Sequence, residues 1–121
     1  MASPKDIKRA QKESVLLRLI SQLFLQAEMD DPKLRGLTIT RVALSPDKGL
    51  CTVYFYTPEG EAAFNEKLSI LKLYKPSMRK AMSQEIPSRY TAELVFRFDD
   101  KFERQAKLEA LIDSVGEREK P

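Results

Sequence analysis

The chain has 121 residues, of which 42% are hydrophobic and 32% charged, and its formal net charge at neutral pH is +3. This length fits one domain, and the composition is typical of a soluble globular protein, not of a disordered or membrane-spanning one. With one cysteine and no histidine, the sequence excludes an internal disulfide and the usual zinc sites, so we expect no metal and no cofactor.

A long amphipathic helix is predicted from about residue 4 to residue 27. Its apolar residues recur at three- and four-residue steps on one face. Ser3 can cap this helix, and Pro4 suits its first turn. Because the residue before a proline is pushed out of the helical region, the sequence Asp30-Asp31-Pro32 should end it.

Two strands are predicted next, over residues 37–44 and 50–56, joined by turn residues 45–49 into a hairpin. In the second strand Cys51, Val53 and Phe55 alternate toward one face. In the first strand Ile39 and Val42 are out of phase, which indicates a bulge or a strong twist near Thr40.

A second helix is predicted over residues 61–74, and Pro76 should break or kink it because proline lacks the backbone N–H and clashes with the preceding turn. A third, shorter helix should run from about residue 77 to residue 85. A loop over residues 86–90 then leads to a strand at residues 94–98.

A last helix should follow Asp99-Asp100, with a polar tail from about Gly116. The fold class that follows is α+β: a three-stranded sheet with helices on one face, in the order α-β-β-α-kink-α-β with a C-terminal helix. We expect residues 1–121 to form a single domain. The N-terminus lacks the apolar segment of a secretory signal, so we expect a cytoplasmic protein without a membrane partner.

Covalent catalysis of the usual kind is not expected. Cys51 lies on the core-facing side of its strand, so it is interpreted as a small buried hydrophobe and not as a reactive thiolate. Asp99 and Asp100 could serve as acid and base groups or bind magnesium, but capping of the following helix is the stronger interpretation. The four glycines are isolated from one another, so no phosphate-binding glycine loop is present.

Basic residues concentrate in the middle of the chain. Between residues 72 and 89 five basic residues stand against one acidic residue. A helix start next to such charge can hold phosphate, although a solvated helix face explains the lysines about as well. The candidate RNA-binding residues are Lys72, Lys75, Ser77, Arg79, Lys80 and Arg89. A second, smaller candidate patch on the first helix consists of Lys5, Lys8, Arg9 and Lys12.

Several segments together resemble the ribosome-binding factor A family, whose order of elements is similar to the type II K-homology arrangement. The matching segments extend from about residue 7 to residue 115, and their joint order is more specific than any one of them. They are Asp31-Pro32-Lys33-Leu34, Thr38-Ile39-Thr40-Arg41-Val42, Ser45-Pro46-Asp47, Val53-Tyr54, Met78-Arg79-Lys80 and Glu93-Leu94-Val95-Phe96-Arg97-Phe98-Asp99.

The resemblance implies a monomeric, non-catalytic factor that binds the free small (30S) ribosomal subunit and 16S rRNA during late maturation and rRNA processing. The resemblance also allows other assembly factors, such as maturation GTPases, as partners. The family has an Ala-x-Gly kink between two helices, and Tyr74 and Pro76 stand at those two positions here. Ala92 stands where the family usually has proline, and Cys51 where it usually has alanine.

Two alternatives remain open from the sequence. One is a general single-stranded RNA-binding protein of the K-homology type. The other is a small α+β enzyme that uses Arg79 or Arg41 to hold a phosphate, and the absence of histidine weighs against it.

Overall fold

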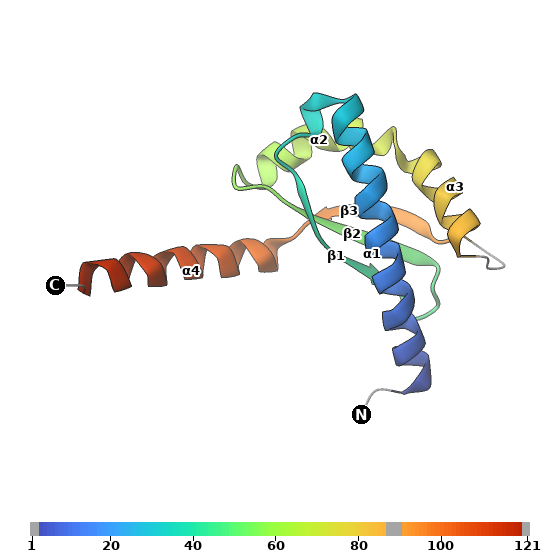
Figure 1. Cartoon of the computed structure of the whole chain (residues 1–121), viewed down its shortest axis with the longest axis horizontal. Helices are drawn as coiled ribbons and strands as arrows, with labels where there is room; N and C mark the ends of the chain where they lie inside the picture. Colours follow the sequence, from blue (N-terminus) through green and yellow to red (C-terminus); the bar gives the residue numbers. More distant parts are fainter. Residues whose placement is uncertain (1–2, 87–90, 120–121) are drawn as a thin grey trace.

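Three helices cover one face of a three-stranded sheet, and a fourth helix projects away from it (Figure 1). The computed structural model describes residues 3–86 and 91–119. Its elements, in chain order, are α1 (Pro4–Asp30), the short 3₁₀ helix η1 (Pro32–Leu34), β1 (Thr38–Leu44), β2 (Leu50–Tyr56), α2 (Glu61–Lys72), α3 (Lys75–Glu85), β3 (Glu93–Phe98) and α4 (Asp100–Glu119). This is the predicted α+β order.

The ends of α1 follow from local chemistry. Ser3 Oγ accepts a hydrogen bond from the Asp6 amide at 3.2 Å, and Asp6 in return accepts from the Ser3 amide at 3.3 Å, so the two residues form a capping box. The helix runs to Asp30, three residues beyond the predicted end. The restriction imposed by Pro32 acts only on Asp31, which is extended (φ −131°, ψ 94°).

The sheet has the order β1-β2-β3, with β1 and β2 antiparallel and β2 and β3 parallel. The register between β1 and β2 shifts between Ile39 and Arg41, which confirms the predicted irregularity at Thr40. In β2, Cys51, Val53 and Phe55 are fully buried, as their alternation predicted.

The core lies between this sheet face and the helices. α1 contributes Leu16, Ile20, Phe24 and Ala27, and its opposite face is exposed. The Phe55 ring lies at the centre, 5.4 Å from the ring of Phe24 and 5.5 Å from that of Phe96, in edge-to-face geometry. Burial of these side chains is the main force that holds α1 on the sheet.

The helical segment is interrupted between α2 and α3, as the position of Pro76 predicted. α2 ends at Lys72, and α3 begins at Lys75 with Pro76 in its first turn. The third helix therefore starts two residues before the predicted position. Proline is tolerated in a first helical turn, because the N–H that it lacks would have no partner within the helix.

α4 continues through Gly116 to Glu119, beyond the predicted end near residue 115. It points away from the sheet and the other helices (Figure 1). Its later apolar side chains are exposed, namely Leu108, Leu111, Ile112 and Val115. Over residues 3–86 and 91–119, no helix combines the length and apolar character needed to cross a bilayer.

Candidate nucleic-acid interface

The junction of α2 and α3 gathers five of the six residues predicted to bind RNA. Lys72 ends α2, and the other four follow within the first two turns of α3. We name Lys72, Lys75, Ser77, Arg79 and Lys80 the junction patch. Lys72, Ser77 and Lys80 are exposed and can meet a ligand. The sixth predicted residue, Arg89, lies outside the described residues.

Two cations of the junction patch contact the sheet. The Arg79 guanidinium donates hydrogen bonds of 3.4 Å to the carbonyls of Thr91 and Ala92, and its Nη1 lies 3.8 Å from a carboxylate oxygen of Glu93. The Lys75 ammonium lies 5.4 Å from the centroid of the Phe96 ring. Arg79 therefore fastens α3 to the start of β3, and part of its hydrogen-bonding capacity is already used.

The second predicted patch gains a residue from a different element. Lys48, in the β1–β2 turn, is exposed, and its pKa is lowered chiefly by the positive charge of Lys12, with further contributions from slight desolvation and from the charges of Lys8 and Lys5. These four lysines therefore share one positive region, which we name the lysine patch. Arg9, predicted to belong to it, forms an ion pair of 3.4 Å with Asp6.

Within residues 3–86 and 91–119, no carboxylate lies within ion-pair distance of the four lysines. The lysine patch thus combines like charges whose repulsion an external anion would relieve. Sequence reasoning missed Lys48, because only the folding of the hairpin turn against α1 brings it to Lys12.

The two patches lie at opposite ends of the helical layer. The α2–α3 junction is near the end of α1, whereas the lysine patch is at its start (Figure 1). A ligand that contacts both patches must therefore extend along the molecule, as a nucleic-acid strand can.

The carboxylate of Asp99 has a structural role, because hydrogen bonds within the protein occupy both of its oxygens. It is 3% exposed, and it accepts hydrogen bonds from Thr40 Oγ1 at 2.6 Å, Arg41 Nε at 3.1 Å and the Phe102 amide at 3.0 Å. Burial alone would raise the pKa of Asp99, but the hydrogen bonds outweigh it and the pKa lies below its ordinary value. The predicted capping role of Asp99 is confirmed.

The groups considered for the enzyme hypothesis are occupied or buried. The Arg41 guanidinium also lies 3.8 Å from the centroid of the Tyr54 ring, so it is held between that ring and Asp99. Burial, assisted by the negative charge of Glu13, raises the pKa of the Cys51 thiol to about 12, and its interpretation as a buried hydrophobe is confirmed. In the described part of the chain, no cluster of acidic or cysteine side chains could hold a metal ion.

Comparison with known proteins gives a consistent result. The sequence model described as "Ribosome-binding factor A" matches residues 8–112. The chain belongs to the ribosome-binding factor A family. The family member from Nitrosococcus oceani is 31% identical over 95% of this chain and 91% of its own length. The member from Halorhodospira halophila is 32% identical over 93% of this chain and 90% of its own length.

Solved structures of the family share this fold. The crystal structure of ribosome-binding factor A from Thermus thermophilus aligns with a TM-score of 0.61 at 25% identity, over 73% of this chain and 92% of that one. The solution structure of a Thermotoga maritima protein described as a putative ribosome binding factor A aligns with a TM-score of 0.56 at 24% identity, over 74% and 81%. The second likeness is one of fold alone.

Proposed function

We propose that this protein is a non-catalytic ribosome-assembly factor. It binds the free small ribosomal subunit and its 16S rRNA in the cytoplasm during late maturation and rRNA processing, and it acts as a monomer. The observation that carries this proposal is the family match over residues 8–112, since relatives of nearly equal length are described as ribosome-binding factors.

The charge distribution supports RNA as the ligand. The chain exposes cations at the junction patch and at the lysine patch, and phosphate contacts by lysine and arginine supply most of the affinity in nucleic-acid binding. Lys72 and Lys80 of the junction patch are exposed and meet phosphates directly. Arg79, already bound to the start of β3, holds the geometry of α3 against the sheet and contributes its remaining donors.

A binding role, and not a catalytic one, is supported by the chemistry of the candidate groups. The sequence has no histidine, the Cys51 thiol is buried with a high pKa, and Asp99 and Arg41 satisfy one another. None of these groups can serve as a general base or nucleophile toward an external substrate without unfolding the structure around it.

Sedimentation with purified ribosomal subunits tests the proposal. At low salt the protein should travel with free small subunits and not with large subunits, and raising the salt should release it. If the protein stays at the top of the gradient at low salt, apart from the small subunits, the proposed function is wrong.

A further inference from the structure

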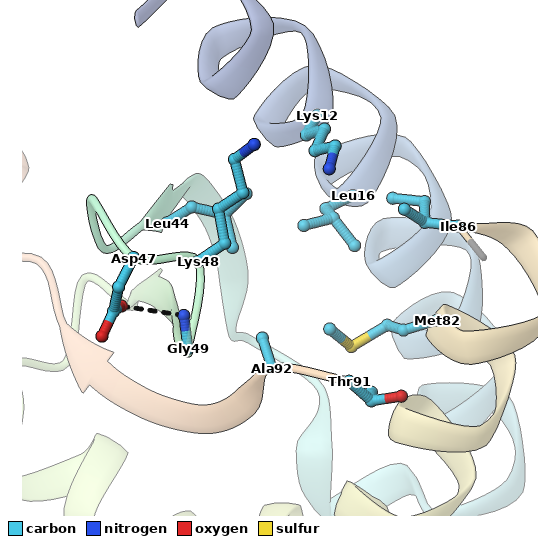
Figure 2. A pocket seen from close by; sticks show the side chains of 10 residues that line it. All are labelled: Lys12, Leu16, Leu44, Asp47, Lys48, Gly49, Met82, Ile86, Thr91 and Ala92. Carbon is cyan, nitrogen blue, oxygen red and sulfur yellow. Dashed lines mark hydrogen bonds between the residues drawn. The ribbon is translucent and has the colours of Figure 1, made fainter. Parts of the chain in front are cut away.

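A hollow of about 460 Å³ opens between α1, the β1–β2 turn and the end of α3 (Figure 2). Its volume lies within the range of roughly 300–1,000 Å³ in which proteins bind small ligands. It is far from the α2–α3 junction, because it involves Met82 and Ile86 at the other end of α3. We name it the turn hollow.

The walls of the turn hollow are apolar. Leu16 of α1, Leu44 of β1 and Met82 of α3 line it, and each is at most 8% exposed. Ala92 and Ile86 complete the apolar surface. Such walls favour a ligand group with an apolar surface, and the face of an aromatic ring is one, because that surface leaves water without losing hydrogen bonds.

The mouth of the turn hollow is positively charged. Figure 2 shows Lys12 and Lys48 reaching toward one another across it, while Asp47 points into its own turn. The Asp47 carboxylate accepts hydrogen bonds from Ser45 Oγ at 2.6 Å and from the Gly49 amide at 2.9 Å. These hydrogen bonds hold the Asp47 carboxylate in its own turn, and among the described residues neither lysine forms an ion pair, so both ammonium groups can attract an anion.

The backbone at Lys48 is itself unusual. Its φ of 61° is in the left-handed region, where glycine or asparagine is the favoured residue. The hydrogen bond of 2.8 Å from its amide to the Ser45 carbonyl holds this conformation. A lysine in this conformation strains the turn locally, and its side chain places a positive charge at the mouth of the hollow.

A second hollow, of about 390 Å³, lies beside the first. Lys12, Lys48 and Ile86 line both hollows, and Lys8 and Val15 extend the second one along α1. The arrangement is therefore an apolar hollow, a pair of cations and another hollow. Single-stranded nucleic acid repeats in the same way, with flat bases on either side of an anionic phosphate.

We propose that the turn hollow receives one unstacked base of single-stranded RNA, whose phosphate lies between Lys12 and Lys48. This inference rests on the proposed function, from which it takes RNA as the ligand, and adds a subsite and a preference for unpaired strands. A duplex cannot enter the hollow, because its bases are stacked and paired.

Two substitutions separate the phosphate contact from the base contact. Lys48→Gly removes the cation and relieves the left-handed strain, so its melting temperature should equal or exceed that of the wild type. Ala92→Leu extends an apolar side chain into the hollow without changing the charge. Lys101→Ala is the matched control, because Lys101 is exposed on α4, away from both hollows.

The experiment measures the affinity of the full-length variants for a fluorescein-labelled single-stranded RNA hexamer and for an RNA duplex, over a series of salt concentrations. Lys48→Gly and Ala92→Leu should each weaken binding of the hexamer by at least about fivefold. Lys48→Gly should also reduce the salt slope by about 0.7, whereas Ala92→Leu should leave the slope unchanged. Lys101→Ala should leave the hexamer affinity unchanged.

The inference is overturned if Lys48→Gly binds the hexamer as well as Lys101→Ala does, or if hexamer and duplex bind alike and a folded Ala92→Leu protein binds the hexamer as the wild type does. In either case sedimentation of the wild type with small subunits decides separately on the proposed function. If Ala92→Leu fails to fold, Lys48→Gly still tests the phosphate contact, and equal wild-type affinities for hexamer and duplex then overturn the base contact.

Discussion

At the scale of single residues, the Asp99 carboxylate connects two separate elements, β1 and α4. Its two oxygens bind Thr40 and Arg41 of β1 and the amide of Phe102 in α4. The bulge in β1 makes this contact, because the extra residue at Thr40 turns its hydroxyl toward Asp99. One side chain thus fixes both the irregularity of β1 and the start of α4.

Replacing Asp99 should therefore destabilise the protein. Asp99→Ala removes a charge-assisted hydrogen bond and a helix cap, and we expect the free energy of unfolding in urea to fall by about 2–4 kcal/mol. Asp100→Ala, at the neighbouring exposed carboxylate, should cost less than about 1 kcal/mol. Equal costs for the two variants would contradict the role given to Asp99.

The contribution of Asp99 should also depend on pH. Its pKa in the folded protein lies below its ordinary value, so the unfolded chain takes up this proton first as the pH falls. The stability that it provides is complete above about pH 4 and is lost as the pH falls through the folded pKa. In urea unfolding between about pH 6 and pH 2, the difference between the wild type and Asp99→Asn should shrink with falling pH. A constant difference would contradict the lowered pKa.

Cys51 should be inert in the folded protein. Its thiol is fully buried and its pKa is raised to about 12, so almost no thiolate forms near neutral pH. A thiol-reactive dye at about pH 8 should label the protein only after urea unfolds it. Rapid labelling of the native protein would show that the strand around Cys51 opens.

At the scale of elements, α4 is the part least coupled to the core. Its first turn is anchored by Asp99 and by the ring of Phe102, 4.8 Å from that of Tyr56, whereas the later apolar side chains are exposed. A chain that lacks residues 108–121 should keep its free energy of unfolding within about 1 kcal/mol of the full chain.

A core substitution provides the comparison for this truncation. Ile20 is fully buried in α1, and Ile20→Ala should cost about 2–5 kcal/mol because it leaves a cavity. If the truncation in α4 costs as much free energy of unfolding as Ile20→Ala, then α4 packs on the rest of the protein, which would contradict the exposure of its later apolar side chains.

Local chemistry explains which elements the sequence could predict. The alternation in β2, the phase error around Thr40 and the break at Pro76 are each set by neighbouring residues, so they could be read from the chain. The exact helix ends could not be predicted, because the restriction from Pro32 stops at Asp31 and leaves Asp30 helical, and because Lys75 is helical directly before Pro76.

The candidate site was less predictable from the sequence than the helices and strands, because it depends on tertiary packing. Lys5, Lys8 and Lys12 could be grouped from their helical spacing, but Lys48 comes from a turn more than thirty residues away. The sequence likewise could not indicate that Arg79 binds the carbonyls before β3, because that contact requires α3 to pack against the sheet.

At the scale of the whole molecule, the positions of the charges matter more than their sum. The formal net charge is only +3, yet cations gather at the junction patch and at the lysine patch, at opposite ends of α1 (Figure 1). The last residues, 99–121, carry seven acidic and five basic residues and do not add to this field. We infer that the helical layer, and not α4, faces the RNA.

The salt dependence of binding to free small subunits tests the RNA-binding role of these cations most directly. For the wild type, the logarithm of the affinity should fall linearly with the logarithm of the salt concentration. The double variant Lys72→Ala, Lys80→Ala should bind more weakly with a shallower slope, whereas Lys101→Ala, Lys107→Ala, with the same change in charge on α4, should keep the wild-type slope. If both double variants change the slope equally, or if wild-type binding does not respond to salt, these cations do not contact ribosomal RNA as proposed.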